Sequence, residues 1–287
     1  MSHLTAQIIY VKILYIIKKE IEIMHSFLQN LLADKTGGEI FRLFSGWHFL
    51  YVGLTAAAVV LILLLAKGKE KDVRVRITNV LITIAFSLYI ADFFLMPLAY
   101  GEIDIEKLPF HACTSMCVMC FISHHNKFLE KYRSSFLMLG FLSNIVYLIY
   151  PAGVMWYAVH PLSYRVIQTL LFHSAMTTYC LISLIFDYDK IKINKCHRDL
   201  IVVVGLTVWA LMGSYVYSGA YGGGDRYFNW FFVVRDPFNA IPESISVFLM
   251  PFLNIAAFFA VEMIIHLIIF GVQKKLKKDN YIKEETK

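Results

Sequence analysis

Charged residues are scarce in this sequence, at 17% of its 287 residues, whereas hydrophobic residues make up 58% and aromatic residues 15%. The mean hydropathy is correspondingly high, at +0.60. An average soluble domain contains about 25% charged residues, and a domain of this length does not need so much apolar surface. The shortage of charge therefore excludes a soluble globular protein and indicates an integral membrane protein.

About seven apolar runs have the length of roughly 17 to 25 residues that a helix needs to cross the hydrocarbon core. They lie at about 47–66, 78–100, 108–124, 134–150, 164–186, 199–219 and 245–271. The sequence thus predicts an all-α fold, a polytopic transmembrane helix bundle over residues 47–272, followed by a basic cytoplasmic tail at 273–287. This leaves no room for a sizeable soluble domain.

Positive charge is scarce in alternate connections between these spans. The segment 151–163 contains no lysine or arginine, the segment 101–107 contains only Lys107, and the segment 220–244 contains only Arg226 and Arg235. The other connections and the tail are rich in both: Lys67, Lys69, Lys71, Arg74, Arg76, Lys127, Lys131, Arg133, Lys190, Lys192, Lys195, Arg198, Lys274, Lys275, Lys277, Lys278, Lys283 and Lys287. Because cationic loops are retained inside, this bias predicts a multi-pass protein of the cell membrane with a cytoplasmic C-terminus. The net charge of +6 is then mostly a topology signal, and we expect no nucleic-acid partner.

Residues 1–46 fit this topology less well, because they carry several cations on the predicted outer side. The apolar stretch from Ile8 to Ile23 is interrupted by Lys18, Lys19, Glu20 and Glu22. It is a poor span, and we interpret residues 1–46 as an interfacial, amphipathic segment. A signal peptide is the weaker alternative, since no small-residue cleavage site follows a clean apolar core. A further hypothesis places the real start at Met24.

Five cysteines are present, and Cys113, Cys117 and Cys120 share one stripe of the third predicted span. A zinc site needs converging ligands with a polar second shell, and a stripe on one helix does not supply them. We therefore expect no metal and no cofactor. Cys117 and Cys120 are interpreted as small, soft residues at helix contacts.

Five polar residues fall inside the apolar runs, and all map to the predicted outer half of the bundle: Asp92, His111, Cys113, Asn144 and His173. At 1.5 Å per residue, Cys113 lies roughly 7 to 8 Å and His173 roughly 13 Å below the outer ends of their spans. An ionisable group in hydrocarbon is costly unless it is paired or hydrated, so this co-location indicates a built site. The alternative is that these residues hydrogen-bond the helices together.

Cys113 needs a base to become a nucleophile, because the thiolate and not the thiol reacts. His111 is two residues away, and on a helix such residues point to nearly opposite sides. His173 lies on another span and is free to face the thiol. Asn144 or Asp92 could orient that imidazole, while amide and backbone donors could stabilise an oxyanion.

Several short motifs resemble the YwaF family of bacterial integral membrane proteins, which is related to transmembrane protein 164. They are Phe-Ser-Gly-Trp-His at 44–48, Leu-Pro-Phe-His-Ala-Cys at 108–113, Tyr-Pro at 150–151 and Phe-His at 172–173. The resemblance covers roughly residues 40–272 and implies a bundle of six or seven helices. For the animal relatives it implies acyl transfer onto lysophospholipids, in which Cys113 would carry the acyl group and His173 would be the base.

Glu262 and His266 lie four residues apart on the last predicted span and can share a face. Interpreted functionally, they form a proton relay; interpreted structurally, they are a mutually satisfied pair. Three functions therefore stay open. The first is a phospholipid acyltransferase using Cys113 and His173 in the outer leaflet, with phospholipids and lysophospholipids as partners. The others are a transporter or permease component using Glu262 and His266, and a non-enzymatic lipid-binding protein; no protein partner is indicated.

Overall fold

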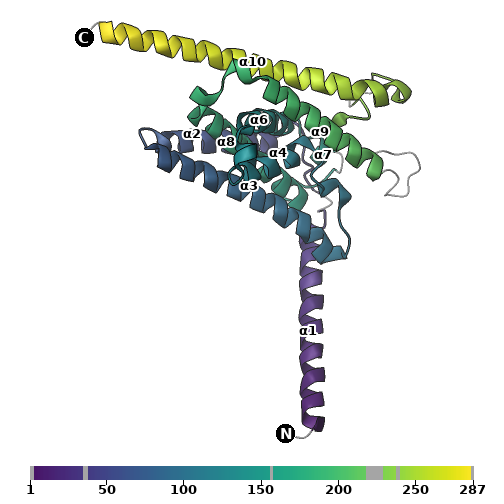
Figure 1. Ribbon diagram of the computed structural model, residues 1–287. Helices are drawn as coiled ribbons and strands as arrows, with labels where there is room; N and C mark the ends of the chain where they lie inside the picture. Colours follow the sequence, from purple (N-terminus) through teal and green to yellow (C-terminus); the bar gives the residue numbers. More distant parts are fainter. Residues whose placement is uncertain (1–2, 35–37, 156–157, 218–228, 237–239, 286–287) are drawn as a thin grey trace.

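A computed structural model describes residues 3–34, 38–155, 158–217, 229–236 and 240–285, and over these residues the chain forms helices and no strand (Figure 1). Six helical segments are long and apolar enough to cross a membrane. They centre on α2 (Gly46–Ala66), α3 (Lys71–Tyr100), α6 (Arg133–Ile149), α8 (Tyr164–Phe186), α9 (His197–Val216) and α10 (Glu243–Glu285). The predicted all-α, polytopic bundle is confirmed.

The third predicted span differs from the other six, because its helix α4 (Ala112–Ser123) has only 12 residues. That length covers about 18 Å, less than the hydrocarbon core of about 30 Å. The missing part is supplied by irregular backbone around the short turn η1 (Ile105–Lys107). The hydroxyl of Tyr89 on α3 donates to the main-chain oxygen of Lys107 at 3.0 Å.

Tyr89 lies roughly 16 Å along α3 from the C-terminal end of that helix at Tyr100. The chain therefore turns back into the bundle after α3 and runs beside it before α4 begins. Irregular backbone at this depth is tolerated where protein covers it. Only residues 112–123 of the apolar run at 108–124 are helical, so the run is not one continuous span. Residues 101–111, which turn back into the bundle before α4, are called the re-entrant segment below.

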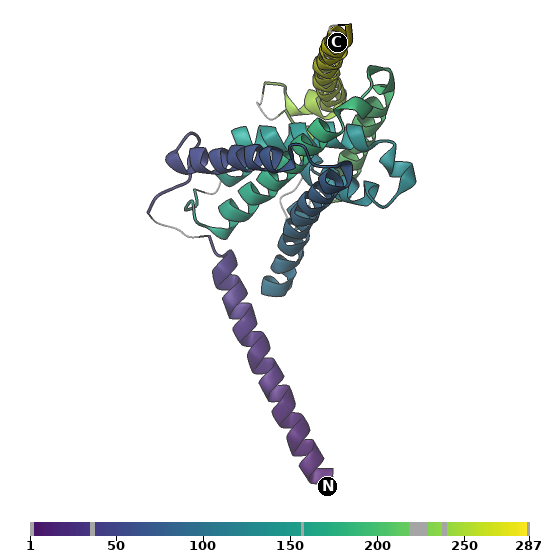
Figure 2. The ribbon, with the colours of Figure 1, turned by 90° about the vertical axis from the view of Figure 1, so that its left-hand side faces the viewer.

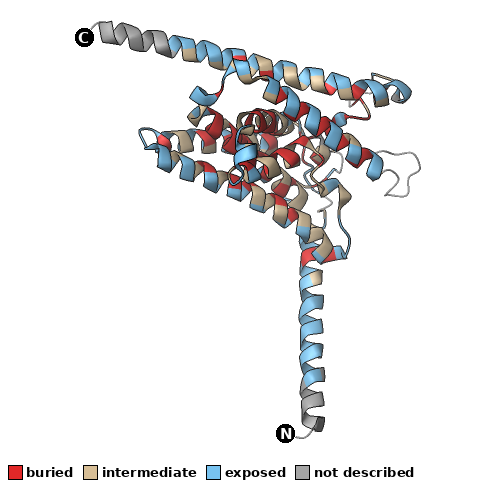
Figure 3. Ribbon diagram, in the orientation of Figure 1, coloured by how far each residue is buried: buried red, intermediate tan, exposed pale blue. Residues whose placement is uncertain are grey.

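Helix α8 lies at the centre of the bundle, packed against α2, α3 and α6. Of its most apolar window, 61% is buried, against 11% for the windows of α2 and α10. Figure 3 shows buried residues gathered on the central helices, with exposed ones along α1 and α10. Apolar side chains on the outer helices face outward, such as Leu64 on α2 and Phe252 on α10. These faces are suited to contact with lipid.

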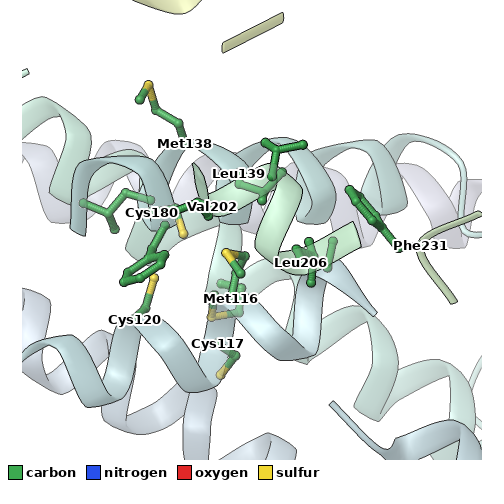
Figure 4. Close-up of a cluster of buried hydrophobic side chains, with 14 of the residues drawn as sticks. Met116, Cys117, Cys120, Met138, Leu139, Cys180, Val202, Leu206 and Phe231 are labelled. Carbon is green, nitrogen blue, oxygen red and sulfur yellow. The ribbon is translucent and has the colours of Figure 1, made fainter. Parts of the chain in front are cut away.

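Sulfur-containing side chains fill much of the core between α4, α6 and α8 (Figure 4). Cys117, Cys120 and Cys180 are fully buried, free thiols in this cluster. Gly140 on α6 permits the close approach, because a Cβ there would lie 3.0 Å from Cys180 Sγ and 3.4 Å from Met116 Cβ. Cys117 and Cys120 thus occupy helix contacts, as small residues at such positions should.

One end of the bundle carries the basic connections and is called the basic end below. The last turns of α2 and α8 lie there together with the first turns of α3, α6 and α9. The connections at this end contain the short helical elements α5 (Lys127–Glu130), η2 (Tyr188–Lys190) and η3 (Ile193–Lys195), and those at the other end contain α7 (Ala152–Met155) and η4 (Trp230–Phe232). By the charge rule, the basic end is the predicted cytoplasmic end.

His48 links the start of α2 to the end of α6 at the opposite end. Its Nε2 lies 2.8 Å from the main-chain oxygen of Leu148, and its Nδ1 accepts from the main-chain N–H of Phe44 at 3.1 Å. A carbonyl only accepts, so Nε2 carries the hydrogen. The histidine of the first motif is therefore a structural link between two spans.

Helix α1 (His3–Leu32) is longer than the expected stretch from Ile8 to Ile23 and extends away from the bundle (Figure 2). It is held at its last turns, where Gln29 Nε2 donates to the main-chain oxygen of Ala99 at 2.9 Å and Leu28 is buried. In Figure 1 it runs across the direction of α3 and not alongside it. An interfacial position for α1 stays a prediction. At the other terminus, α10 continues as helix into the predicted basic tail.

Candidate functional site

Three of the five predicted site residues lie on α4, α6 and α8 beyond the contact at Gly140, on the side away from the basic end. Helix α6 runs away from the basic end, whereas α4 and α8 run toward it. Asn144 follows Gly140 by one turn on α6, and Cys113 precedes Met116 by three residues on α4. On α8 the atom nearest to a Cβ at position 140 is Cys180 Sγ, at 3.0 Å, and His173 precedes Cys180 by seven residues. Asn144 and Cys113 therefore lie about one turn, and His173 about two turns, from this contact along their helices.

His173 is 5% exposed and is held by two contacts within the bundle. Its Nδ1 lies 2.7 Å from the main-chain oxygen of Thr169, so Nδ1 carries the hydrogen. The ring of Tyr147 stacks on the imidazole, with centroids 3.8 Å apart and an interplanar angle of 12°. The other nitrogen, Nε2, is buried and has no hydrogen-bond partner among the described residues.

This arrangement leaves His173 as an oriented imidazole with a free lone pair on Nε2, which is the form that a general base needs. The orienting group is the main-chain oxygen of Thr169. Neither Asp92 nor Asn144 takes that role in the described structure, because each is engaged elsewhere. Thr169 lies four residues before His173 on the same helix, so the sequence alone could have suggested this hydrogen bond.

Cys113 is half-buried at the second position of α4. The main-chain N–H groups of Cys113 and Thr114 lie beside its thiol. Main-chain N–H groups at a helix N-terminus that have no intrahelical acceptor can interact with negative charge that develops nearby. Within the described residues no hydrogen bond joins the thiol to His173 or His111. The nucleophile and base candidates lie on the same side of the Gly140 contact but are not hydrogen-bonded to each other.

His111 is the N-cap residue of α4, with extended backbone at φ −73° and ψ 148°. The expectation that it points away from Cys113 required both residues to be helical, and His111 is outside the helix. Its side chain does not cap α4, and it lies within electrostatic range of His173. His111 thus stays a supporting candidate on the same side of the bundle as His173.

Asp92 is 5% exposed and anchors the re-entrant segment. Its carboxylate forms an ion pair with the ammonium group of Lys107, and Tyr164 at the start of α8 donates its hydroxyl to Asp92 at 3.1 Å. These partners offset the cost of a buried charge. Asp92 therefore positions the chain leading to α4. Lys107 was identifiable as the single basic residue of its connection; Tyr164 carried no such signal.

Asn144 is fully buried on α6. Its Nδ2 donates to the main-chain oxygen of Gly140 at 2.7 Å, while its Oδ1 is buried with no hydrogen-bond partner among the described residues. A buried acceptor without a donor is costly in a folded protein. The free Oδ1 can accept a hydrogen bond from a hydroxyl group that enters at this depth.

The expected pairing of Glu262 with His266 is not found. His266 Nε2 lies 2.5 Å from Oδ2 of Asp199 on α9, and both side chains are at most 3% exposed. Glu262 is fully buried, and neither of its carboxylate oxygens has a hydrogen-bond partner among the described residues. His266 pairs with Asp199 and not with Glu262 because α10 packs against α9. Sequence reasoning missed Asp199, an acidic residue at the inner end of the sixth predicted span.

Two cavities open at the basic end, and neither is lined by the five predicted site residues. One of about 440 Å³ lies between α2, α3 and α8 beside Arg74. The other, of about 460 Å³, lies between the starts of α6 and α9 and the end of α8.

The apolar helices, the re-entrant segment and the buried polar side chains define a multi-pass integral membrane protein. The chain belongs to the TMEM164 family, whose family model matches residues 43–273. This result agrees with the resemblance to the related YwaF family. Neither the curated proteins nor the solved structures contain a match to this chain.

Proposed function

We propose that this protein is a cysteine- and histidine-dependent phospholipid acyltransferase that acts in the outer leaflet of the cell membrane. One observation carries the proposal. The free Nε2 of the buried, oriented His173 lies on the same side of the Gly140 contact as Cys113, which occupies the first turn of α4. A helix N-terminus for the nucleophile and a fixed tautomer for the base are what cysteine-dependent acyl transfer requires.

In the first half-reaction, the Cys113 thiol gives its proton to His173 Nε2, and the thiolate attacks the ester carbonyl of a phospholipid. The ester C–O bond breaks, and the imidazolium returns the proton to the leaving glycerol oxygen. A thioester on Cys113 and a lysophospholipid are the products. The thiol must turn toward Nε2 for this step, and catalytic contacts often tighten only when substrate is bound.

In the second half-reaction, the hydroxyl of an acceptor lysophospholipid gives its proton to His173 Nε2 and attacks the thioester. The C–S bond breaks, and the released thiolate takes the proton back. The first-turn N–H groups of α4 stabilise the thiolate as it leaves. Asn144 Oδ1 accepts a hydrogen bond from the acceptor hydroxyl and orients it. Both lipids reach this depth laterally without leaving the bilayer.

The test is mass spectrometry of the purified protein after incubation with a phospholipid labelled in its acyl chains, together with an unlabelled lysophospholipid. We expect an acyl adduct on Cys113 and labelled diacyl product. Cys113→Ser and His173→Ala should each lower the product rate by about 10² to 10⁴. Cys196→Ser and His125→Ala are the matched controls at the basic end and should react like the wild type. Absence of adduct and product across a broad lipid panel refutes the proposal.

A second candidate function, a proton-coupled carrier, is favoured by the buried carboxylate of Glu262. An ionisable group inside a membrane bundle without a hydrogen-bond partner is a functional-site candidate in its own right. The test is solute uptake into proteoliposomes under a pH gradient. Flux that Glu262→Gln abolishes and Cys113→Ser leaves intact selects the carrier over the acyltransferase.

A further inference from the structure

The cavity between α6, α8 and α9 is large enough to hold a small polar group with part of a chain attached. Its volume is about 460 Å³, within the range of about 300 to 1,000 Å³ that small-molecule sites occupy. Three separate segments of the chain form its wall. They are the α5–α6 region, the connection after α8 with η2 and η3, and the first turn of α9.

Positive charge dominates the wall of this cavity. Glu130 and Asp187 are its two acidic residues. Its six basic residues are Lys127, Lys131, Arg133, Lys190, Lys195 and Arg198. Asp187 is already paired with Lys190 at 2.6 Å, so the other five basic side chains face a single remaining carboxylate. The charge rule for cytoplasmic loops requires only that cations be present in those loops. Here the cations of three segments line one cavity, which the charge rule does not require.

The floor of the cavity is apolar. Leu137, Leu184 and Ile191 line it and are each at most 6% exposed. At the edge of this floor, Arg133 Nε is buried with no hydrogen-bond partner among the described residues. The guanidinium of Arg133 lies beside the hydroxyl of Tyr179. A basic rim above an apolar floor matches a molecule with an anionic head and an apolar stem.

We propose that this cavity binds the phosphate of an anionic glycerophospholipid head group from the leaflet at the basic end. Arginine and lysine are the side chains that recognise phosphate, arginine through its fork of N–H donors and lysine as a point charge. The cavity lies at the end of the spans, which is the depth of lipid phosphates, and its apolar floor accepts the glycerol end of the acyl chains. This site is separate from Cys113 and His173, at the opposite end of the bundle.

The test measures retention of phosphatidylglycerol and of phosphatidylcholine by the full-length protein in neutral detergent, using native mass spectrometry. The wild type should retain phosphatidylglycerol in preference to phosphatidylcholine. Lys127→Gln/Lys195→Gln removes two cations from the rim and should weaken phosphatidylglycerol binding about tenfold or more. Lys127→Arg/Lys195→Arg keeps the charge and should restore retention, which separates binding from folding.

The matched control is Lys69→Gln/Lys192→Gln, which removes the same charge from the basic end without touching the cavity wall. It should bind phosphatidylglycerol within about twofold of the wild type. Equal losses in the two glutamine variants, or equal retention of the two lipids by the wild type, overturn the proposal. Displacement of the lipid by inorganic phosphate at the same concentration also overturns it, because it shows a site for free phosphate and not for a head group.

Discussion

Replacement of Gly213 by alanine tests the packing that places the re-entrant segment. Gly213 lies on α9 directly against the ring of Phe110, a residue three positions after η1 ends at Lys107. A Cβ at this position would lie 2.5 Å from Cδ1, 2.6 Å from Cγ and 2.8 Å from Cε1 of that ring. The ring has no room to retreat, since Trp209 and Trp230 each contact it with centroids 4.8 Å away. The substitution therefore forces either α9 or the segment before α4 to move.

The magnitude follows from two opposing contributions. Overpacking a filled core costs about 1 to 3 kcal/mol, whereas glycine to alanine in a helix interior is favourable by up to about 1 kcal/mol. Three ring atoms inside contact distance put the clash at the upper end of its range, so we expect a net loss of roughly 1 to 3 kcal/mol of unfolding free energy. The assay is equilibrium unfolding of the purified protein in mixed micelles with increasing sodium dodecyl sulfate.

Gly205→Ala is the matched control on the same helix, because a Cβ there meets nothing within 4 Å. It should be neutral or stabilise by up to about 1 kcal/mol. In a Phe110→Ala background the obstacle is gone, and Gly213→Ala should then stop being destabilising. The reasoning is refuted if Gly213→Ala is as benign as Gly205→Ala, or if its coupling to Phe110→Ala is below about 0.5 kcal/mol.

Two other buried contacts yield predictions measured by the same unfolding assay. Asp199→Ala leaves His266 without its partner and should cost about 3 to 5 kcal/mol, since one member of a buried pair is removed; a loss below about 1 kcal/mol contradicts the pairing. Lys107→Met leaves the Asp92 carboxylate without its cation, so we expect a similar loss and faster amide hydrogen exchange over residues 101–111. Its control is Lys67→Met, an exposed lysine at the basic end, and unchanged exchange in the Lys107 variant counts against the anchor.

The spans themselves were readable in the sequence, because the length and apolarity of a run are local properties that the bilayer selects directly. The third span shows where this reading fails. Residues 108–124 are apolar enough to be predicted as one span, yet Pro109 and the pairing of Lys107 with Asp92 keep the first part out of the helix. Hydropathy records how apolar a segment is and not whether its backbone is helical.

The candidate site divides in the same way. Asp92, His111, Cys113, Asn144 and His173 stood out because polar residues are rare in apolar runs. The groups that contact these residues were not predicted, because the contacts form between helices or between successive turns of one helix. The contact of Tyr147 with His173 joins α6 to α8, and the distance between these residues in the sequence carries no sign of it.

The sequence by itself determined that this chain is a multi-pass helical membrane protein with one strongly basic side, since both properties follow from composition and from local periodicity. Tertiary structure alone decided the partners: His266 with Asp199, Asp92 with Lys107, and the His173 ring with Tyr147. The physical reason is that a buried polar group must find a partner wherever packing brings one within reach. Close approach at Gly140 and Gly213 sets which helices meet, and so which partners are available.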